Sequence, residues 1–206
     1  YTRHCNENPG QNEENEDLGE RQFLRGILVH EVMEEILREN IGSSVLETCR
    51  SIRPRIVARL VKEKFRGSSI YSLSEFEEVP SVSEMKNMIL SGIRMIASKF
   101  PRFQITSVEQ EFDSPPIRGI IDLILSDNSQ FIVLDWKTGQ RKPNTNNNLQ
   151  MGTYVRIVKE LESTANVGAF FALIHSRQKK IVPCYFSAEF DTQLENVIQS
   201  DLGTWT

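Results

Sequence analysis

The first half of the chain has the spacing of apolar residues that is typical of α-helices. Over residues 20–39 an apolar side chain recurs every three or four positions, which predicts an amphipathic helix that ends near Gly42. Ser81, followed three positions later by Glu84, predicts a capping box at the start of another helix, which ends before Pro101. The predicted helices of this half span residues 20–39, 44–51, 54–66 and 81–100.

After Pro101 the pattern changes to short runs rich in β-branched and aromatic residues, which predict strands. The segment Asp127-Asn128-Ser129 predicts a turn that joins the second and third strands into a hairpin. The predicted elements of this half are strands at 103–112, 118–126 and 130–137, a helix at 147–161, strands at 167–174 and 179–186, and a helix from about residue 188. This order of elements predicts a protein that combines helices with a sheet.

The composition is that of one globular domain of ordinary size. The chain has 206 residues, of which 39% are hydrophobic and 25% are charged. Its longest apolar stretch, around residues 168–174, is far shorter than the roughly 20 residues that span a bilayer, and its polar start is unlike a signal peptide. Cys5, Cys49 and Cys184 are scattered and form no CxxC pair, which argues against a zinc site or a disulfide framework. We therefore expect a cytoplasmic protein with reduced cysteines.

Charge is unevenly distributed along the chain. Residues 1–20 hold six acidic residues and a single basic one, which predicts a disordered acidic tail or linker ahead of a domain at 21–206. Between Arg50 and Arg66 there are seven basic residues and one acidic residue, Glu63. Such a run is either a solvated helix face or a surface that binds nucleic acid.

Two predicted strands carry charges that interrupt an apolar run. In FIVLDWK, Asp135 and Lys137 share one face of the strand, and in GIIDLIL the only charge is Asp122. If the two strands pair antiparallel, the two aspartates lie a few ångströms apart on one face. The arrangement is either a buried pair of Asp135 with Lys137 or a site for a divalent cation, which offsets the repulsion between two carboxylates.

Two helices carry polar residues one turn apart. Gly26 and His30 are spaced i, i+4 on the first helix, and Gln150 and Tyr154 have the same spacing after the third strand. His30 is either a structural core histidine or a ligand, and the glycine one turn away allows another backbone or a ligand to approach closely. The second pair is either the polar edge of an amphipathic helix or a part of the same site.

In order, GILVH (26–30), GIID (119–122), DWK (135–137) and QMGTY (150–154) resemble the GxxxH, GxxD, DxK and QxxxY motifs of RecB-type nucleases in the PD-(D/E)XK superfamily. Glu109 is similar to a further acidic position of that family, with Glu111 close by. The resemblance implies a restriction-endonuclease-like α/β core, in which a central mixed sheet is flanked by helices, with an N-terminal helical portion.

The resemblance also implies the roles of individual residues. The implied metal ligands are His30, Asp122, Asp135 and the backbone carbonyl of Trp136. Glu109 is a further candidate ligand. Lys137 would orient the attacking water and stabilise charge at the phosphate, and Gln150 and Tyr154 would support the site or touch the nucleic acid. The implied cofactor is Mg²⁺ or Mn²⁺. The chain lacks the four-cysteine iron–sulfur cluster of some relatives, and it lacks a GxxxxGK[ST] loop, so no bound nucleotide is expected.

The function that follows is a metal-dependent deoxyribonuclease, either an exonuclease or the nuclease module of a helicase–nuclease in DNA repair and recombination. Its partners would be DNA and a helicase domain or subunit. The basic residues expected to contact nucleic acid are Arg55, Arg59, Lys62, Arg141 and Lys142. The alternative is a non-enzymatic module that keeps the nuclease fold and binds nucleic acid or a partner subunit.

Overall fold

The computed structural model describes residues 25–67, 81–114, 117–139, 141–163, 166–175 and 178–202. The chain begins within these limits with an N-terminal helix over residues 25–38. The other helices are α2 (Val45–Ser51), α3 (Pro54–Gly67), α4 (Val82–Lys99), α5 (Leu149–Leu161) and α6 (Phe190–Leu202). The strands are β1 (Gln104–Ser114), β2 (Ile117–Ser126), β3 (Phe131–Lys137), β4 (Val167–His175) and β5 (Gln178–Pro183). The predicted helices and strands are thus confirmed in kind and order, and the predicted acidic tail at 1–20 lies outside the described residues.

The five strands form one mixed sheet with the order β1-β2-β3-β4-β5. The first three strands pair antiparallel as a meander, β3 and β4 pair in parallel, and β5 returns antiparallel to β4. The parallel pair requires a crossover, and α5 provides it. The predicted turn between β2 and β3 is confirmed, because Asp127 Oδ1 accepts hydrogen bonds from the backbone N–H groups of Ser129 and Gln130.

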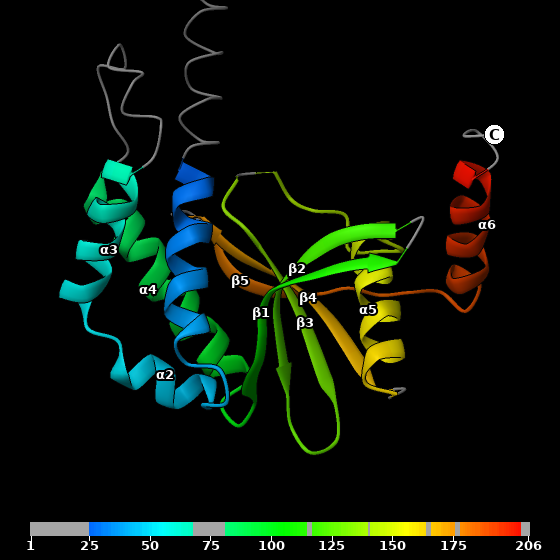
Figure 1. Ribbon diagram of the computed structural model, residues 1–206, viewed down its shortest axis with the longest axis horizontal. Helices are drawn as coiled ribbons and strands as arrows, with labels where there is room; N and C mark the ends of the chain where they lie inside the picture. The colour runs from blue at the N-terminus through cyan, green and yellow to red at the C-terminus, as the bar shows by residue number, and fades with distance from the viewer. Residues whose placement is uncertain are drawn as a thin grey trace, which may run out of the picture.

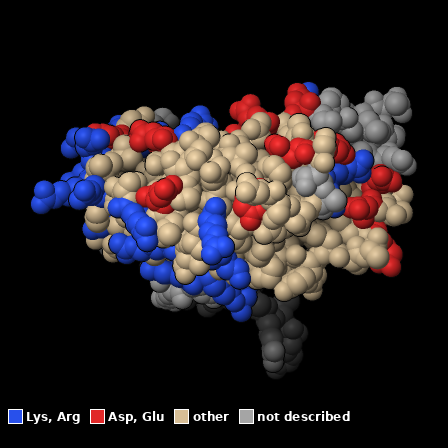
Figure 2. Space-filling model, turned by 90° about the horizontal axis from the view of Figure 1, so that it is seen from below, with Lys and Arg blue, Asp and Glu red and all other residues tan. Residues whose placement is uncertain are grey.

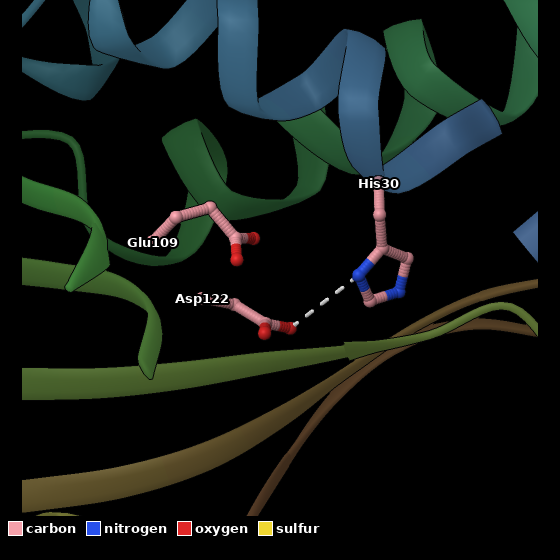
Figure 3. Close-up of side chains that lie close together, drawn as sticks. All are labelled: His30, Glu109 and Asp122. Atoms are coloured by element: carbon pink, nitrogen blue, oxygen red, sulfur yellow. Dashed lines mark ion pairs between the residues drawn. The ribbon is translucent and has the colours of Figure 1, made fainter. Parts of the chain in front are cut away.

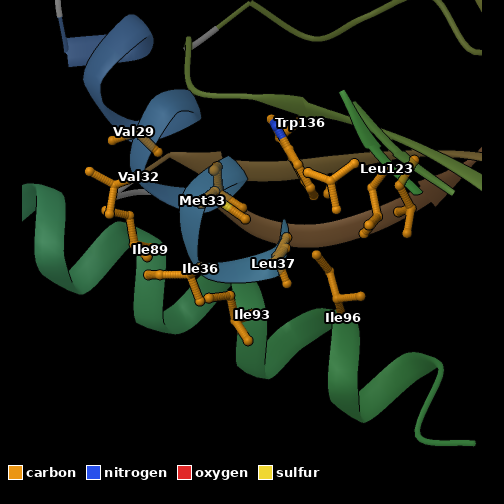
Figure 4. Packing of buried hydrophobic residues seen from close by; sticks show 14 of the residues in the cluster. Val29, Val32, Met33, Ile36, Leu37, Ile89, Ile93, Ile96, Leu123 and Trp136 are labelled. Carbon is orange, nitrogen blue, oxygen red and sulfur yellow. The ribbon is translucent and has the colours of Figure 1, made fainter. Parts of the chain in front are cut away.

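Helices cover both faces of the sheet (Figure 1). On one face the N-terminal helix and α4 pack their apolar sides together and onto residues such as Leu123 and Trp136 (Figure 4). On the other face α5 packs on Val133 and Phe171. The core therefore has two layers, one on each side of the sheet, which confirms the predicted mixed sheet flanked by helices with an N-terminal helical portion.

The predicted capping box at the start of α4 is wrong. Ser81 occupies the N-cap position but its side chain makes no capping hydrogen bond. Glu84 instead pairs with Arg25 of the N-terminal helix, with 3.0 Å between Nη1 and Oε1. A capping box does occur at α2, where Ser44 and Glu47 satisfy each other's backbone N–H groups.

The last predicted strand is shorter than expected. The run at 179–186 predicts a longer strand, whereas β5 ends at Pro183, which has no N–H to donate to the sheet. Tyr185 instead pairs with Asn146 in the segment that leads into α5. None of the helices within the described ranges is long and apolar enough to cross a membrane.

Candidate metal centre and active site

Asp122 lies where β2 and β3 stop pairing. The ladder between these strands ends at the pair Leu123 and Leu134, so Asp122 and Asp135 are the next residues along the two strands. Asp122 is buried, with 8% of the residue exposed, and its Oδ2 accepts a hydrogen bond of 2.9 Å from the backbone N–H of Trp136. The Asp122 side chain therefore accepts the hydrogen bond of the buried Trp136 N–H, just beyond the last residue pair of β2 and β3. This hydrogen bond holds the carboxylate in place.

Glu109 brings a second carboxylate to the same place from β1. The pairs that flank it, Val108 with Leu123 and Gln110 with Ile121, put it level with Asp122 on the neighbouring strand. Its φ of 49° lies in the left-handed region, which costs a non-glycine residue on the order of 1–3 kcal/mol. Its neighbour Glu111 is exposed. Glu109, and not Glu111, is thus the acidic residue of β1 that the fold brings to the site.

His30 reaches the two carboxylates from the N-terminal helix. Its Nδ1 lies 4.0 Å from Asp122 Oδ2, and its ring meets the ring of Trp136 edge-on, with 6.4 Å between the centroids. His30, Glu109 and Asp122 point toward one another from a helix and two strands, and each offers a ligand atom within 4.8 Å of the others (Figure 3). Two ligands of one cation with bonds of about 2.1–2.2 Å are at most about 4.4 Å apart, so a small contraction would let all three bind the same ion.

Asp135 and Lys137 form an ion pair beside this cluster. Asp135 is 2% exposed, and its Oδ2 lies 2.6 Å from Lys137 Nζ. This short contact pairs the buried carboxylate with the lysine ammonium, and the remaining lone pairs of the carboxylate stay available. The lysine side chain is 35% exposed, and its ammonium lies 5.5 Å from the centre of the Phe171 ring. The predicted Asp135–Lys137 pair is therefore present, and it leaves Asp135 able to accept a further electrophilic partner.

The electrostatics of the site favour the binding of a cation. Burial, together with the charge of Asp135, raises the pKa of Asp122 to about 8, although the N–H of Trp136 opposes this shift. Burial also raises the pKa of Glu109 and that of Asp135. Burial and the nearby ammonium of Lys137 lower the pKa of His30 to about 4, so its imidazole is neutral at pH 7. Buried carboxylates and a neutral imidazole form a donor set that fits a divalent cation.

The Gln150–Tyr154 pair lies on α5, on the other side of β3. Gln150 donates a hydrogen bond of 2.9 Å from Nε2 to the hydroxyl of Tyr154, whose ring packs edge-on against Phe112. Burial raises the pKa of Tyr154, and the charges of the site's carboxylates contribute to this shift. Tyr154 is therefore buried within electrostatic reach of the site, whereas Gln150 is exposed.

A cleft of about 540 Å³ opens between the N-terminal helix, β1 and the end of β3. Its lining residues are Gly26, Ile27, His30, Glu31, Glu34, Glu109, Thr138 and Gly139. Five of these residues lie outside the site predicted from the sequence: Ile27, Glu31, Glu34, Thr138 and Gly139. The signal for Glu34 was present, because it follows His30 by one helical turn, and Thr138 and Gly139 directly follow the DWK segment.

The basic residues predicted to contact nucleic acid lie outside this cleft. Arg55, Arg59 and Lys62 are exposed on α3. Arg141 and Lys142 are exposed in the segment between β3 and α5, shortly after Gly139. Among the described residues, the cleft lining contains three glutamates and no lysine or arginine.

A family model of the PD-(D/E)XK nuclease superfamily matches residues 3–203, so the chain belongs to this superfamily. No curated protein matches the chain. The mixed five-stranded sheet with helices on both faces is consistent with the restriction-endonuclease-like fold of the family. Membership indicates a nuclease that hydrolyses phosphodiester bonds, and the His30–Glu109–Asp122 cluster could hold the divalent metal that such nucleases typically use.

Proposed function

We propose that the chain is a deoxyribonuclease that depends on Mg²⁺ or Mn²⁺ and hydrolyses DNA phosphodiester bonds. The observation that carries this proposal is the convergence of His30, Glu109 and Asp122 within 4.8 Å, next to the Asp135–Lys137 ion pair. A purely structural role does not account for this arrangement, because it concentrates buried carboxylates that repel one another and includes a residue with an unfavourable backbone conformation.

The residues of the cluster divide the chemistry among them. His30, Glu109 and Asp122 would hold the cation, with Asp135 and the backbone carbonyl of Trp136 as further ligands. A divalent cation at this position supplies a Lewis acid that makes water a better nucleophile and neutralises charge on the phosphate. The hydrogen bond that the Trp136 N–H donates holds the Asp122 carboxylate in position at the site.

Lys137 and Tyr154 act next to the cation. The Lys137 ammonium is partly exposed and paired with Asp135, so it can hold the attacking water and stabilise the charge that grows on the phosphate. Tyr154, oriented by its hydrogen bond with Gln150, supports the site from α5 or touches the nucleic acid. Arg55, Arg59, Lys62, Arg141 and Lys142 contribute contacts to phosphates, because their exposed cations release counterions when they bind a polyanion.

We also propose that the chain is of the RecB type within its superfamily. Support comes from the placement of the four motifs, which lie on the N-terminal helix, β2, β3 and α5 in chain order. Such a chain acts as an exonuclease or as the nuclease module of a helicase–nuclease in DNA repair and recombination, with a helicase as its partner. A cytoplasmic location agrees with Cys49 and Cys184, which are both free.

The test is cleavage of end-labelled linear and circular DNA of identical sequence, with Mn²⁺, Mg²⁺ or EDTA. We expect cleavage that requires the metal and is lost in Asp135→Ala. Asp113→Ala is the control, because Asp113 is an exposed carboxylate of β1 that pairs with Arg118 and does not line the cleft. Cleavage of linear DNA alone supports an exonuclease. Metal-independent binding with no cleavage under any condition would instead support the non-enzymatic module.

A further inference from the structure

The cleft that holds the candidate site is acidic. Three of the eight described residues that line it are glutamates. Glu34 is held by Arg38 at 2.7 Å, so one of these negative charges is partly offset. Without metal, this cleft repels a phosphodiester backbone more than it attracts it. The affinity for a polyanion therefore has to come from another surface.

The helices α2, α3 and α4 carry such a surface. Within the described residues 44–67 and 81–102 there are three acidic residues, Glu47, Glu63 and Glu84. The same residues include eleven basic ones: Arg50, Arg53, Arg55, Arg59, Lys62, Lys64, Arg66, Lys86, Arg94, Lys99 and Arg102. We call these eleven residues the basic helical surface. The excess is opposite in sign to the whole chain, whose net charge is −4.

Most of these cations are not used in ion pairs. Arg59 pairs with Glu63 on the same helix, and Lys64 pairs with Glu35 of the N-terminal helix. Across the described part of the chain, none of the other nine has an ion-pair partner. Free cations of this number keep their charge available for a ligand, and they repel one another until a polyanion binds.

The cations are ordered along α3. Arg55, Arg59, Lys62 and Arg66 follow each other at intervals of four, three and four residues, so they form one stripe on the helix. The opposite side of α3 carries the buried residues Val57, Leu60 and Val61. The stripe extends over about 16 Å, which corresponds to several successive phosphates of a nucleic acid strand. This regular stripe matches the repeated charge of a phosphodiester backbone.

The basic helical surface is separate from the cleft. The N-terminal helix lies between them, because its Glu34 lines the cleft while its Glu35 binds Lys64 of α3. Figure 2 shows Lys and Arg side chains gathered on the half of the molecule that holds α2, α3 and α4, and Asp and Glu predominating on the half that holds α5 and α6. No member of the surface lines the cleft.

We infer that the basic helical surface is a docking site for the nucleic acid backbone that works without metal and outside the catalytic cleft. The identity of the polyanion rests on the proposed function. Binding there is electrostatic and independent of sequence, and it raises the local concentration of the strand near the acidic cleft. It extends from α3 to Arg94 and Lys99 of α4, two exposed residues that the motifs do not include.

The experiment measures binding of fluorescein-labelled duplex and single-stranded 20-mers by anisotropy in EDTA, over a range of salt concentrations. Two double variants test the surface: Arg55→Gln with Lys62→Gln, and Arg94→Gln with Lys99→Gln. The matched control is Arg118→Gln with Lys159→Gln, which removes the same charge from β2 and α5. Each surface variant should flatten the slope of log K against log salt by up to about 1.8 for duplex and about 1.4 for single strands. The control should change the slope far less.

A surface variant with an unchanged slope, or a control that flattens the slope equally, would overturn the inference. So would a polyglutamate peptide that binds as tightly as an oligonucleotide of equal charge, because the surface would then suit an acidic protein segment. Thermal melts and Mn²⁺ titrations of each variant verify that the fold and the metal cluster are intact. Binding through α3 and α4 without any cleavage would contradict the proposed hydrolysis and leave this inference standing. Cleavage by variants whose salt slopes are unchanged would contradict this inference and leave the proposed hydrolysis standing.

Discussion

The carboxylate of Asp122 accepts the backbone N–H of Trp136 at 2.9 Å, at the point where β2 and β3 cease to pair. The Asp122 side chain therefore satisfies a backbone N–H just beyond the paired part of β2 and β3, and it also belongs to the candidate metal cluster. The geometry of the site is for this reason coupled to the register of the sheet, and substitutions of Asp122 affect both stability and activity.

Asp122→Asn is expected to separate these two roles. The amide oxygen can still accept the N–H of Trp136, but the charge that binds metal is lost. Cleavage should fall by more than about 100-fold, since even residues that only support a metal ligand change activity by about 10- to 100-fold. Asp122→Ala should lose cleavage as well, and its unfolding free energy should drop by about 1–3 kcal/mol because a buried N–H is left without an acceptor. Initial cleavage rates and urea denaturation in EDTA measure both effects, and a fully active Asp122→Asn would remove this residue from the site.

The metal-free protein should lose stability as the pH rises from 7 to 8.5. The pKa of Asp122 is about 8 in the folded state against 3.8 for the free side chain, so the stability it contributes is complete below pH 3.8 and is lost as the pH rises through 8. His30 has the opposite sign, because its pKa falls from 6.5 to about 4 on folding, so its contribution is constant above about pH 7.

The loss over this window should be on the order of 1–2 kcal/mol, since one pKa unit corresponds to about 1.4 kcal/mol. Urea unfolding in EDTA at pH 7.0, 7.5, 8.0 and 8.5 measures it. Measurements stop at pH 8.5 because the Cys184 thiol begins to contribute above it: its pKa is raised from 9.0 to about 12. Asp122→Asn should show a smaller decline than wild type, and a saturating divalent cation should abolish the decline. Equal declines in wild type and Asp122→Asn would assign the effect to other groups.

His30→Ala should weaken metal binding more than it weakens binding of DNA. An imidazole ligand suits Mn²⁺ better than Mg²⁺, so the loss of affinity should be larger for Mn²⁺. We expect a fall of about tenfold or more for Mn²⁺ in calorimetric titrations. Glu109→Gln should behave similarly, and Glu111→Gln is its control on the same strand. A His30→Ala protein that melts earlier but titrates metal like wild type would identify His30 as a structural residue.

Much of the fold was predictable because its elements have strong local patterns. The alternation in β2 and β3 predicted that Asp122 and Asp135 approach each other, and their adjacent positions beyond the last strand pair agree with this. The position of Glu109 relative to Glu111 could not be decided from the sequence. It depends on a shift of register between Ile105 and Ser107 and on the positive φ of Glu109, and neither has a signature in the residue types.

Long-range contacts account for the remaining differences. Ser81 and Glu84 have the spacing of a capping box, but Glu84 finds a partner in Arg25, which is 59 residues away in the chain. The ion pair between Glu84 and Arg25 therefore forms in place of the local capping interaction between Ser81 and Glu84. The acidic lining of the cleft was likewise hidden, because Glu31 and Glu34 belong to an ordinary polar helix face until β1 places Glu109 opposite them.

The last prediction concerns Gly26, which lies next to Thr138. A Cβ atom on Gly26 would come within 2.9 Å of Thr138 Oγ1, so any larger residue pushes the segment that directly follows Lys137. A displacement of about 1 Å at a catalytic group can cost up to about 100-fold in rate, so Gly26→Ala should lower the cleavage rate substantially. Thr138→Ala removes the clashing hydroxyl, and the double variant should therefore be no less active than Thr138→Ala alone.

Gly92→Ala is the matched control for Gly26→Ala. Its Cβ would also meet a side-chain atom at 2.9 Å, Ile174 Cγ2, but on α4 and away from the cleft lining. Both substitutions should lower the melting temperature, because each overpacks a close contact at a cost of typically about 1–3 kcal/mol. Gly26→Ala alone should reduce the cleavage rate measured well below the melting temperature. Equal rates in the two variants, or independent effects of Gly26→Ala and Thr138→Ala in the double-mutant cycle, would show that Gly26 only packs the helix and does not position the end of β3.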